Sequence, residues 1–279
     1  MEIHITTLSE NTAAIPGLLA EWGLSILAEV DGQKILLDAG LSNSTVHNAL
    51  FLSMDLSTID KIVLSHSHVD HTGGLRELLG TMRKQVEIIA HPDVWAPKYI
   101  KRPGEEDYRY IGIPFAREEL EGLGASFVLD KEPVWITDHI VTTGEIPMLT
   151  DYEQIDPILY AREENDFRPD PLRDDRALVI KTDLGLVVIT GCAHRGIINT
   201  LRHAQELTGV ERIDTVVGGT HLIRAEAEQL ELTIANLQEM GIQRLGVSHC
   251  TGAQASIRLA EEFGEIFFLN NAGTRFTVP

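Results

Sequence analysis

Residues 62–71 read Ile-Val-Leu-Ser-His-Ser-His-Val-Asp-His, which places four potential metal ligands directly after a short apolar run. The apolar residues show no polar alternation, as is typical of a strand covered on both faces. On an extended segment, side chains two residues apart project the same way, so His66, His68 and Asp70 are expected to converge. His71 is expected to turn toward a neighbouring point. One short segment therefore predicts ligands for two metal ions.

The chemistry of these side chains indicates a catalytic site. Imidazole and carboxylate ligands without a cage of thiolates leave coordination positions open for water, and they suit zinc, manganese or iron. A cluster of loop histidines without a metal is the alternative, but buried imidazole and carboxylate groups are costly unless something coordinates them. The glycines of the following Thr72-Gly73-Gly74 allow the backbone to turn sharply into a helix.

The remaining sequence predicts two β-rich halves, each followed by helices. Predicted strands cover residues 1–7, 25–30, 34–38, 61–65, 177–182, 186–190, 213–217, 244–248, 266–269 and 275–278, and predicted helices cover 197–208, 227–237 and 255–263. Such halves favour two packed sheets covered outside by helices, which is a four-layered αββα sandwich of the α+β class. We expect a single domain over residues 1–279, with a loop-rich, proline-rich insertion at about 92–176 that serves a function.

Composition limits the partners of the chain. The formal net charge of −19 repels polyanions, which argues against a nucleic-acid-binding protein. No apolar run approaches the roughly 18 residues that span a bilayer, and no secretory signal is recognised, so we expect no membrane insertion and a cytoplasmic location. The two cysteines, Cys192 and Cys250, each lie within two residues of a histidine, and are either thiols beside the site or ordinary buried thiols.

The pattern His-x-His-x-Asp-His after a strand resembles the signature of the metallo-β-lactamase superfamily, whose fold is the αββα sandwich predicted above. The resemblance implies that His66 and His68 bind a first metal ion, and that Asp70 and His71 bind a second. Both sites then need ligands from the second half of the chain.

Two later segments are candidates for these ligands, Gly191-Cys192-Ala193-His194 and Val247-Ser248-His249-Cys250. Both follow predicted strands, where members of the superfamily place their later ligands, so the resemblance implies His194 for the first metal and His249 for the second. Many members carry a bridging Asp after Thr-Gly, whereas this chain has Cys192 there. Cys192, Asp174 and Asp175 remain the alternatives for a bridging ligand.

Four further phrases resemble one group of the superfamily, labelled 7,8-dihydropterin-6-methyl-4-(β-D-ribofuranosyl)aminobenzene-5'-phosphate synthase. They are Gly23–Leu27, Thr143–Pro147, Gly191–Asn199 and Gly218–Leu222. This resemblance implies a phosphorylated small-molecule substrate that is linked to a pterin. His221 is expected to contact the substrate or its phosphate, beside Gly218-Gly219, whose backbone N–H groups could approach an anion closely.

The predicted insertion is unusually aromatic and basic for so acidic a chain. Such side chains could stack on a flat ring and pair with a phosphate, or could simply form a solvated loop with a few core anchors. The candidates are Tyr99, Lys101, Arg102, Tyr108, Arg109, Tyr110, Phe115, Arg162, Arg168, Arg173 and Arg176.

We therefore expect a hydrolase or transferase with two divalent cations, zinc first and Mn²⁺ or Fe²⁺ as alternatives, acting on a phosphate-containing or related ester. The nucleophile is expected to be metal-activated water, with Asp70 and His221 as the catalytic residues. The alternative is a sensor of the same fold that binds a metal and a ligand without turnover.

Overall fold

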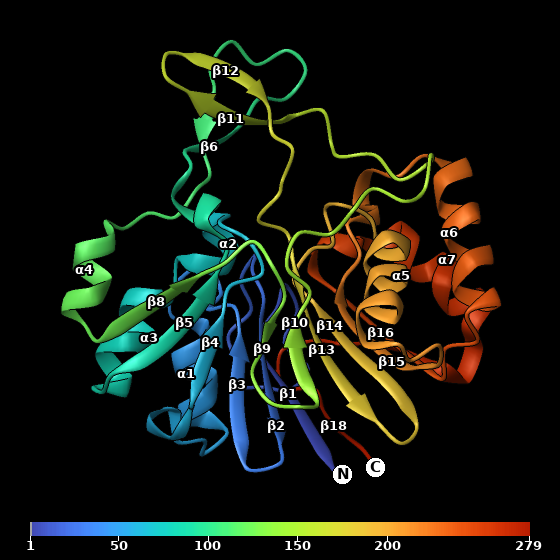
Figure 1. Ribbon diagram of the computed structural model, residues 1–279, viewed down its shortest axis with the longest axis horizontal. Coiled ribbons are helices and arrows are strands. Elements are labelled where there is room, and N and C mark those ends of the chain that lie inside the picture. The colour runs from blue at the N-terminus through green and yellow to red at the C-terminus, as the bar shows by residue number, and fades with distance from the viewer. Residues whose placement is uncertain (1) are drawn as a thin grey trace.

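Two seven-stranded sheets pack face to face in the computed structural model, which describes residues 2–279 (Figure 1). The first has the order β18 (Arg275–Val278), β1 (Ile3–Ser9), β2 (Ser25–Val30), β3 (Gln33–Leu37), β4 (Lys61–Val63), β5 (Val86–Ala90) and β8 (Ala125–Leu129). The second has the order β17 (Phe267–Leu269), β16 (Arg244–Ser248), β15 (Ile213–Gly219), β14 (Gly185–Thr190), β13 (Ala177–Thr182), β10 (Ile140–Thr142) and β9 (Val134–Trp135).

Branched aliphatic side chains fill the space between the two sheets. Ile26, Leu37 and Val63 of the first sheet and Val187 and Ile189 of the second belong to one fully buried cluster. These strands are apolar without alternation because both of their faces are covered, as the sequence indicated. The interface between the sheets is therefore an apolar core that fixes how the two halves of the chain meet.

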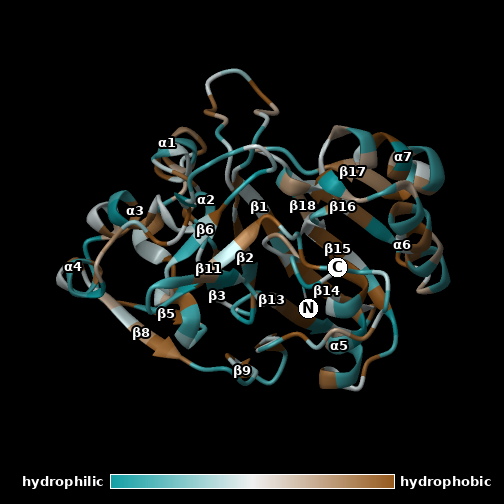
Figure 2. Ribbon diagram, turned by 90° about the horizontal axis from the view of Figure 1, so that it is seen from above, coloured by the Kyte–Doolittle hydropathy of each residue, from teal (hydrophilic) through white to brown (hydrophobic). Residues whose placement is uncertain are grey.

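Helices cover the outer face of each sheet (Figure 2). On the first sheet lie α1 (Ser44–Phe51), α3 (Leu75–Met82) and α4 (Arg117–Gly122), and on the second lie α5 (Ile197–Thr208), α6 (Ala227–Glu239) and α7 (Ala253–Phe263). The short α2 (Val69–Thr72) lies at the strand ends of the first sheet. Short 3-10 turns occur at Leu56–Thr58, Pro92–Trp95, Leu222–Arg224, His249–Thr251 and Gly264–Ile266. The predicted αββα sandwich is confirmed. Within residues 2–279, no helix combines the length and the apolar character needed to cross a bilayer.

Residues 92–176 supply parts of several layers. They contain α4, β8, β9 and β10, and also a separate four-stranded sheet with the order β12 (Asp166–Pro169), β11 (Leu159–Glu163), β6 (Lys98–Ile100) and β7 (Arg109–Tyr110). We call this four-stranded sheet the roof sheet, because it lies above the strand ends of the sandwich (Figure 1). The division of the chain into a single domain with an insertion stays a prediction.

Two glycines after the histidine motif are required by close backbone contacts. A Cβ on Gly73 would lie 2.1 Å from the carbonyl oxygen of Leu41, and a Cβ on Gly74 would lie 2.1 Å from that of Ala39. Both atoms belong to backbone that cannot swing aside. The motif is thus pressed directly against the loop that follows β3, which explains why a side chain is excluded here.

Substitution Gly74→Ala is expected to lower the free energy of unfolding by about 1–3 kcal/mol or more, because the new methyl group overlaps backbone atoms. Gly80→Ala is the matched control, since a Cβ at this position of α3 meets nothing within 4 Å. It should raise stability by up to about 1 kcal/mol through helix propensity. Urea unfolding followed by circular dichroism measures both, and equal values for the two variants would contradict the packing described.

Candidate metal centre

Loops from both sheets meet at one edge of the sandwich. Strands β3, β4 and β5 run parallel to one another, and so do β14, β15 and β16, so each set delivers its following loops to the same edge. The loop after β4 carries the histidine motif, and the loops after β14, β15 and β16 carry His194, His221 and His249. Residues far apart in the sequence are therefore brought together by topology.

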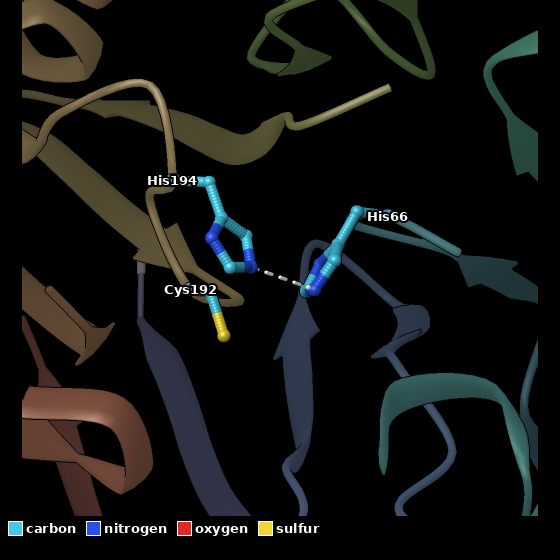
Figure 3. A group of neighbouring side chains, drawn as sticks. All are labelled: His66, Cys192 and His194. Atoms are coloured by element: carbon cyan, nitrogen blue, oxygen red, sulfur yellow. Dashed lines mark hydrogen bonds between the residues drawn. The ribbon is translucent and has the colours of Figure 1, made fainter. Parts of the chain in front are cut away.

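The first cluster consists of His66, His68, Cys192 and His194. The Nε2 atom of His66 lies 3.1 Å from Nδ1 of His68 and 3.2 Å from Nε2 of His194. The donor atoms of His66, Cys192 and His194 all lie within 4.8 Å of one another. Figure 3 shows a ring nitrogen of His194 directed at a ring nitrogen of His66, with the side chain of Cys192 beside the pair. All four side chains are buried.

The second cluster consists of Asp70, His71, Cys192 and His249. The Cys192 Sγ atom lies 3.2 Å from Nε2 of His71, and these two donors lie within 4.8 Å of the donor of His249. Asp70 joins at the edge of the cluster, where its carboxylate lies 3.3 Å from Nε2 of His249. Cys192 thus belongs to both clusters.

The backbone of the motif differs from the predicted extended segment. Strand β4 ends at Val63, and α2 begins at Val69 with His68 as its N-cap residue. The expected alternation therefore fails after His68, and a helical turn directs Asp70 toward His249 rather than alongside His66 and His68. The side chains of the motif do lie at two points, but the local geometry that the prediction gave as the cause was wrong. Their roles as metal ligands stay a prediction.

Three of the histidines are fixed by a hydrogen bond between an oxygen atom and Nδ1, the ring nitrogen that faces away from the clusters. The pairs are Ser65 Oγ with Nδ1 of His66 at 2.8 Å, Asp38 Oδ2 with Nδ1 of His71 at 2.7 Å, and Asn11 Oδ1 with Nδ1 of His249 at 2.9 Å. Each partner fixes the orientation of its ring and leaves Nε2 directed into the cluster. This arrangement is typical of histidines that bind metal ions.

Asp38 and Asn11 were not found from the sequence. Asp38 follows β3 as a polar residue at a strand end, and this position was the available signal. Its carboxylate is fully buried and accepts hydrogen bonds from the Ser65 N–H (2.7 Å), the Ser65 hydroxyl (2.6 Å) and His71. Asn11 lies in the loop after β1, and no local pattern connects it to His249 across the chain.

Burial and neighbouring charges determine the protonation of the histidines. Burial lowers the pKa of His68 to about 4, and burial together with surrounding imidazoles lowers the pKa of His66 and His194 well below the usual value. These three rings are therefore neutral at pH 7 and have lone pairs to offer a cation. Burial acts in the same direction on His71, but Asp38 and Asp70 outweigh it and raise its pKa to about 9.

The three candidates for a bridging ligand lie in different places. Cys192 is shared by both clusters, whereas neither Asp174 nor Asp175 belongs to any His/Cys/carboxylate cluster within residues 2–279. Asp174 accepts hydrogen bonds from Ser67, and Asp175 accepts one from the Arg195 N–H at 2.9 Å. Both aspartates therefore form hydrogen bonds to the loops that carry the clusters and are not members of the clusters themselves.

His221 lies beside the first cluster, with its ring centroid 4.0 Å from that of His194. Both of its ring nitrogens are buried without a hydrogen-bond partner, and one lies within 4.8 Å of the sulfur atoms of Cys192 and Cys250. Of the two neighbouring glycines expected to approach an anion, Gly219 is not available, because its N–H donates to the Gly191 carbonyl at 3.0 Å. A 3-10 turn of three residues follows in place of the expected helix.

Several backbone conformations at the centre are left-handed. Asp38, Ala193, His221 and His249 have φ angles of 61°, 55°, 50° and 54°. Residues with a Cβ seldom adopt this conformation, and they concentrate at functional sites, where the surrounding structure enforces it.

A cavity of about 660 Å³ opens between the two clusters and the roof sheet. Its wall on the side of the clusters includes His68, Asp70, Cys192, His194, His221, His249 and Cys250, with Arg224 following His221 in the chain, and its wall on the side of the roof sheet includes Ile100, Arg102, Arg109, Tyr110, Ile158 and Leu159. Trp22 also lines it and lies against His249 at 5.1 Å between ring centroids. Arg224 and Trp22 were not among the sequence candidates, because nothing local marks them.

Only some of the aromatic and basic candidates line this cavity. Arg102, Arg109 and Tyr110 do so, whereas Tyr108 stacks on Phe167 at 3.7 Å. The others pack or lie elsewhere: Tyr99 against Tyr110, Lys101 over Tyr108, Phe115 under Arg76, Arg162 over Phe167, Arg168 beside Glu163, Arg173 exposed, and Arg176 buried with a hydrogen bond to the Asp130 carbonyl. The mixture predicted as one ligand-binding set thus also builds the roof sheet itself.

Known proteins share both the sequence and the fold. The chain is 33% identical to the 7,8-dihydropterin-6-methyl-4-(beta-D-ribofuranosyl)-aminobenzene-5'-phosphate synthase of Methanocaldococcus jannaschii, with 97% of this chain and 95% of that protein covered. It is 30% identical to the uncharacterized protein MJ0448 of the same organism, with 92% and 94% covered. The crystal structure of Tm1679, a metal-dependent hydrolase of the beta-lactamase superfamily, superposes with a TM-score of 0.84 and 28% identity over 99% of both chains.

The family model described as the metallo-beta-lactamase superfamily matches residues 23–198, which include the histidine motif and the loop after β14. Sequence, fold and the arrangement of the histidines agree, and the chain belongs to the metallo-β-lactamase superfamily.

Proposed function

We propose that this protein is a two-metal enzyme that hydrolyses or transfers at a phosphate-containing ester. The observation that supports the proposal is the pair of clusters that share Cys192 at the wall of a 660 Å³ cavity. The first metal would be held by His66, His68 and His194, and the second by Asp70, His71 and His249. Cys192, which lies between them, would be the bridging ligand.

The spacing of the donor atoms suits a small divalent cation. Ligand nitrogens 2.0–2.1 Å from a tetrahedral zinc ion lie roughly 3.3 Å apart. The nitrogens of the first cluster lie 3.1 and 3.2 Å apart, which is close to this spacing. Nε2 of His68 and Nδ1 of His194 are buried and have no hydrogen-bond partner. A site with histidines, a carboxylate and one thiolate favours zinc, with Mn²⁺ and Fe²⁺ as alternatives.

Two bound cations lower the pKa of water and stabilise negative charge on phosphate oxygens. The side chains of the protein would direct that chemistry. The pKa of Asp70 lies below the usual range, since His71 and His249 outweigh the effect of burial, so its carboxylate is an acceptor that can orient a water molecule. His221, on the cavity wall with both ring nitrogens unpaired, would contact the substrate or its phosphate.

The opposite wall of the cavity suits a flat, anionic substrate. Tyr110 presents an aromatic surface, and Arg102 and Arg109 present two cations in a chain that is strongly acidic overall. Arg224, in the turn after His221, adds a third cation to the lining, where it pairs with Asp156, another lining residue, at 3.4 Å. The similar synthase of M. jannaschii is named for a dihydropterin and a 5'-phosphate. A phosphorylated, pterin-linked small molecule is therefore the substrate class that we propose.

Zinc titration tests the metal centre. Chelator-treated protein is expected to take up two zinc ions per chain, and at 100 times its dissociation constant each zinc ion should stabilise the fold by about 2.7 kcal/mol. His194→Ala should weaken uptake, because it removes one imidazole of the first cluster. Isothermal titration calorimetry and thermal unfolding measure these effects. A folded protein that neither binds zinc nor changes its melting temperature would refute the metal centre.

Asp70→Ala tests the role of the carboxylate in turnover. With phosphomonoesters, phosphodiesters and thioesters as the panel, kcat of the zinc-loaded variant should fall by at least about 100-fold, the size of effect that a positioned proton acceptor supplies. Asp183→Ala is the control, because Asp183 is exposed in the β13–β14 turn, at the end of those strands away from the clusters. Near-normal kcat for zinc-loaded Asp70→Ala would remove this role, and a zinc-loaded wild type without turnover would favour a sensor.

A further inference from the structure

We propose that Asp174 is a positioning residue that holds the histidine motif in place and, through Lys98, ties it to the roof sheet. The inference deepens the proposed function and rests on it in one respect, namely that His66 and His68 bind a metal ion. The sequence offered Asp174 only as an alternative bridging ligand. The contacts of its carboxylate indicate a positioning role instead.

Both donors of Ser67 bind one oxygen atom of Asp174. The Ser67 N–H donates to Oδ2 at 2.9 Å, and the Ser67 hydroxyl donates to the same atom at 2.8 Å. Ser67 is fully buried and stands between His66 and His68 in the chain. Its backbone and its side chain are therefore fixed together, and this fixes the direction in which the two flanking histidines leave the backbone.

The other oxygen atom of Asp174 binds a buried lysine. Lys98 Nζ lies 3.1 Å from Oδ1 of Asp174 and 2.9 Å from Oδ2 of Asp170, and all three side chains are at most 2% exposed. Lys98 is the first residue of β6, a strand of the roof sheet. The ammonium group thus links the cover of the cavity to the loop that carries two of the proposed ligands.

A second contact connects the same two parts of the molecule. The N–H of Val69, at the start of α2, donates to the Ile111 carbonyl at 2.7 Å, and the N–H of Ile111 donates to the Lys98 carbonyl at 2.9 Å. The roof sheet and the motif therefore meet through the backbone as well as through the ion pair. Displacement of one is expected to displace the other.

The contribution of these charged groups to the stability of the fold does not explain why they are buried. Two carboxylates and an ammonium group lose their hydration when buried, and such groups contribute little net stability even when well paired. Asp170 accepts hydrogen bonds from Lys98 and from the Leu172 N–H and does not reach Ser67. Asp170 and Asp174 thus contact the same lysine and are buried to the same extent. Only Asp174 also contacts the histidine motif.

This difference provides a matched pair of variants. Asp174→Asn and Asp170→Asn each remove one negative charge that pairs with the same buried lysine. Only Asp174→Asn also weakens the hydrogen bonds from Ser67. We expect Asp174→Asn to bind zinc about 10-fold to 100-fold more weakly than the wild type, as for other residues that orient metal ligands. Asp170→Asn should change the affinity by less than threefold. Competition with a chromophoric zinc chelator measures all three proteins.

Equal losses of affinity in the two variants, or wild-type affinity in folded Asp174→Asn, would overturn the positioning role. Should Asp174→Asn fail to fold, Ser67→Ala takes its place, since it removes the hydroxyl bond to Asp174 and leaves the ion pair intact. A smaller loss of zinc affinity is then expected, and none would overturn the proposal. Wild-type protein that binds no zinc in the same assay would instead refute the proposed function.

Discussion

The buried carboxylate of Asp38 is the contact on which the geometry of the centre depends. It joins the end of β3 to the first residues after β4 through both donors of Ser65, and it holds the ring of His71. Because Ser65 in turn contacts His66, one side chain positions a histidine in each cluster. A charge this deeply buried is tolerable only when fully hydrogen-bonded, so the loops around it have little freedom to move.

The centre also depends on the close approach of the two sheets. His66 comes from the first half of the chain and His194 from the second, yet their ring nitrogens lie 3.2 Å apart. Such a distance requires that the apolar interface below them be tightly packed, since a shift of the sheets would separate the two rings. The aliphatic core between the sheets is therefore part of the functional site, although it contributes no polar atom to it.

The sequence predicted what was local and missed what was long-range. Apolar runs located ten of the fourteen strands of the sandwich, and β5, β8, β9 and β10 were missed. The dense His/Asp motif located four of the seven side chains that form the two clusters. Asn11 and Lys98 could not be predicted, because each acts on a residue brought near only by the fold. For Asp38 the only signal was its position at the end of a strand, and its partners too are brought near by the fold. The motif was predicted to be extended, but a helical turn starts at Val69. This turn brings Gly73 and Gly74 into close contact with the loop after β3, which is again a contact that depends on the fold.

The left-handed conformations of Asp38, Ala193, His221 and His249 have a consequence for the folding landscape. Each costs up to about 1–2 kcal/mol for a residue with a Cβ, so the four together cost roughly 4–8 kcal/mol, which spans the lower end of the net stability of a typical domain, about 5 kcal/mol. The centre is thus a locally frustrated region inside a well-packed sandwich. It should open at lower free energy than the strands beneath it, so its amide protons should exchange with solvent before those of β14 and β15.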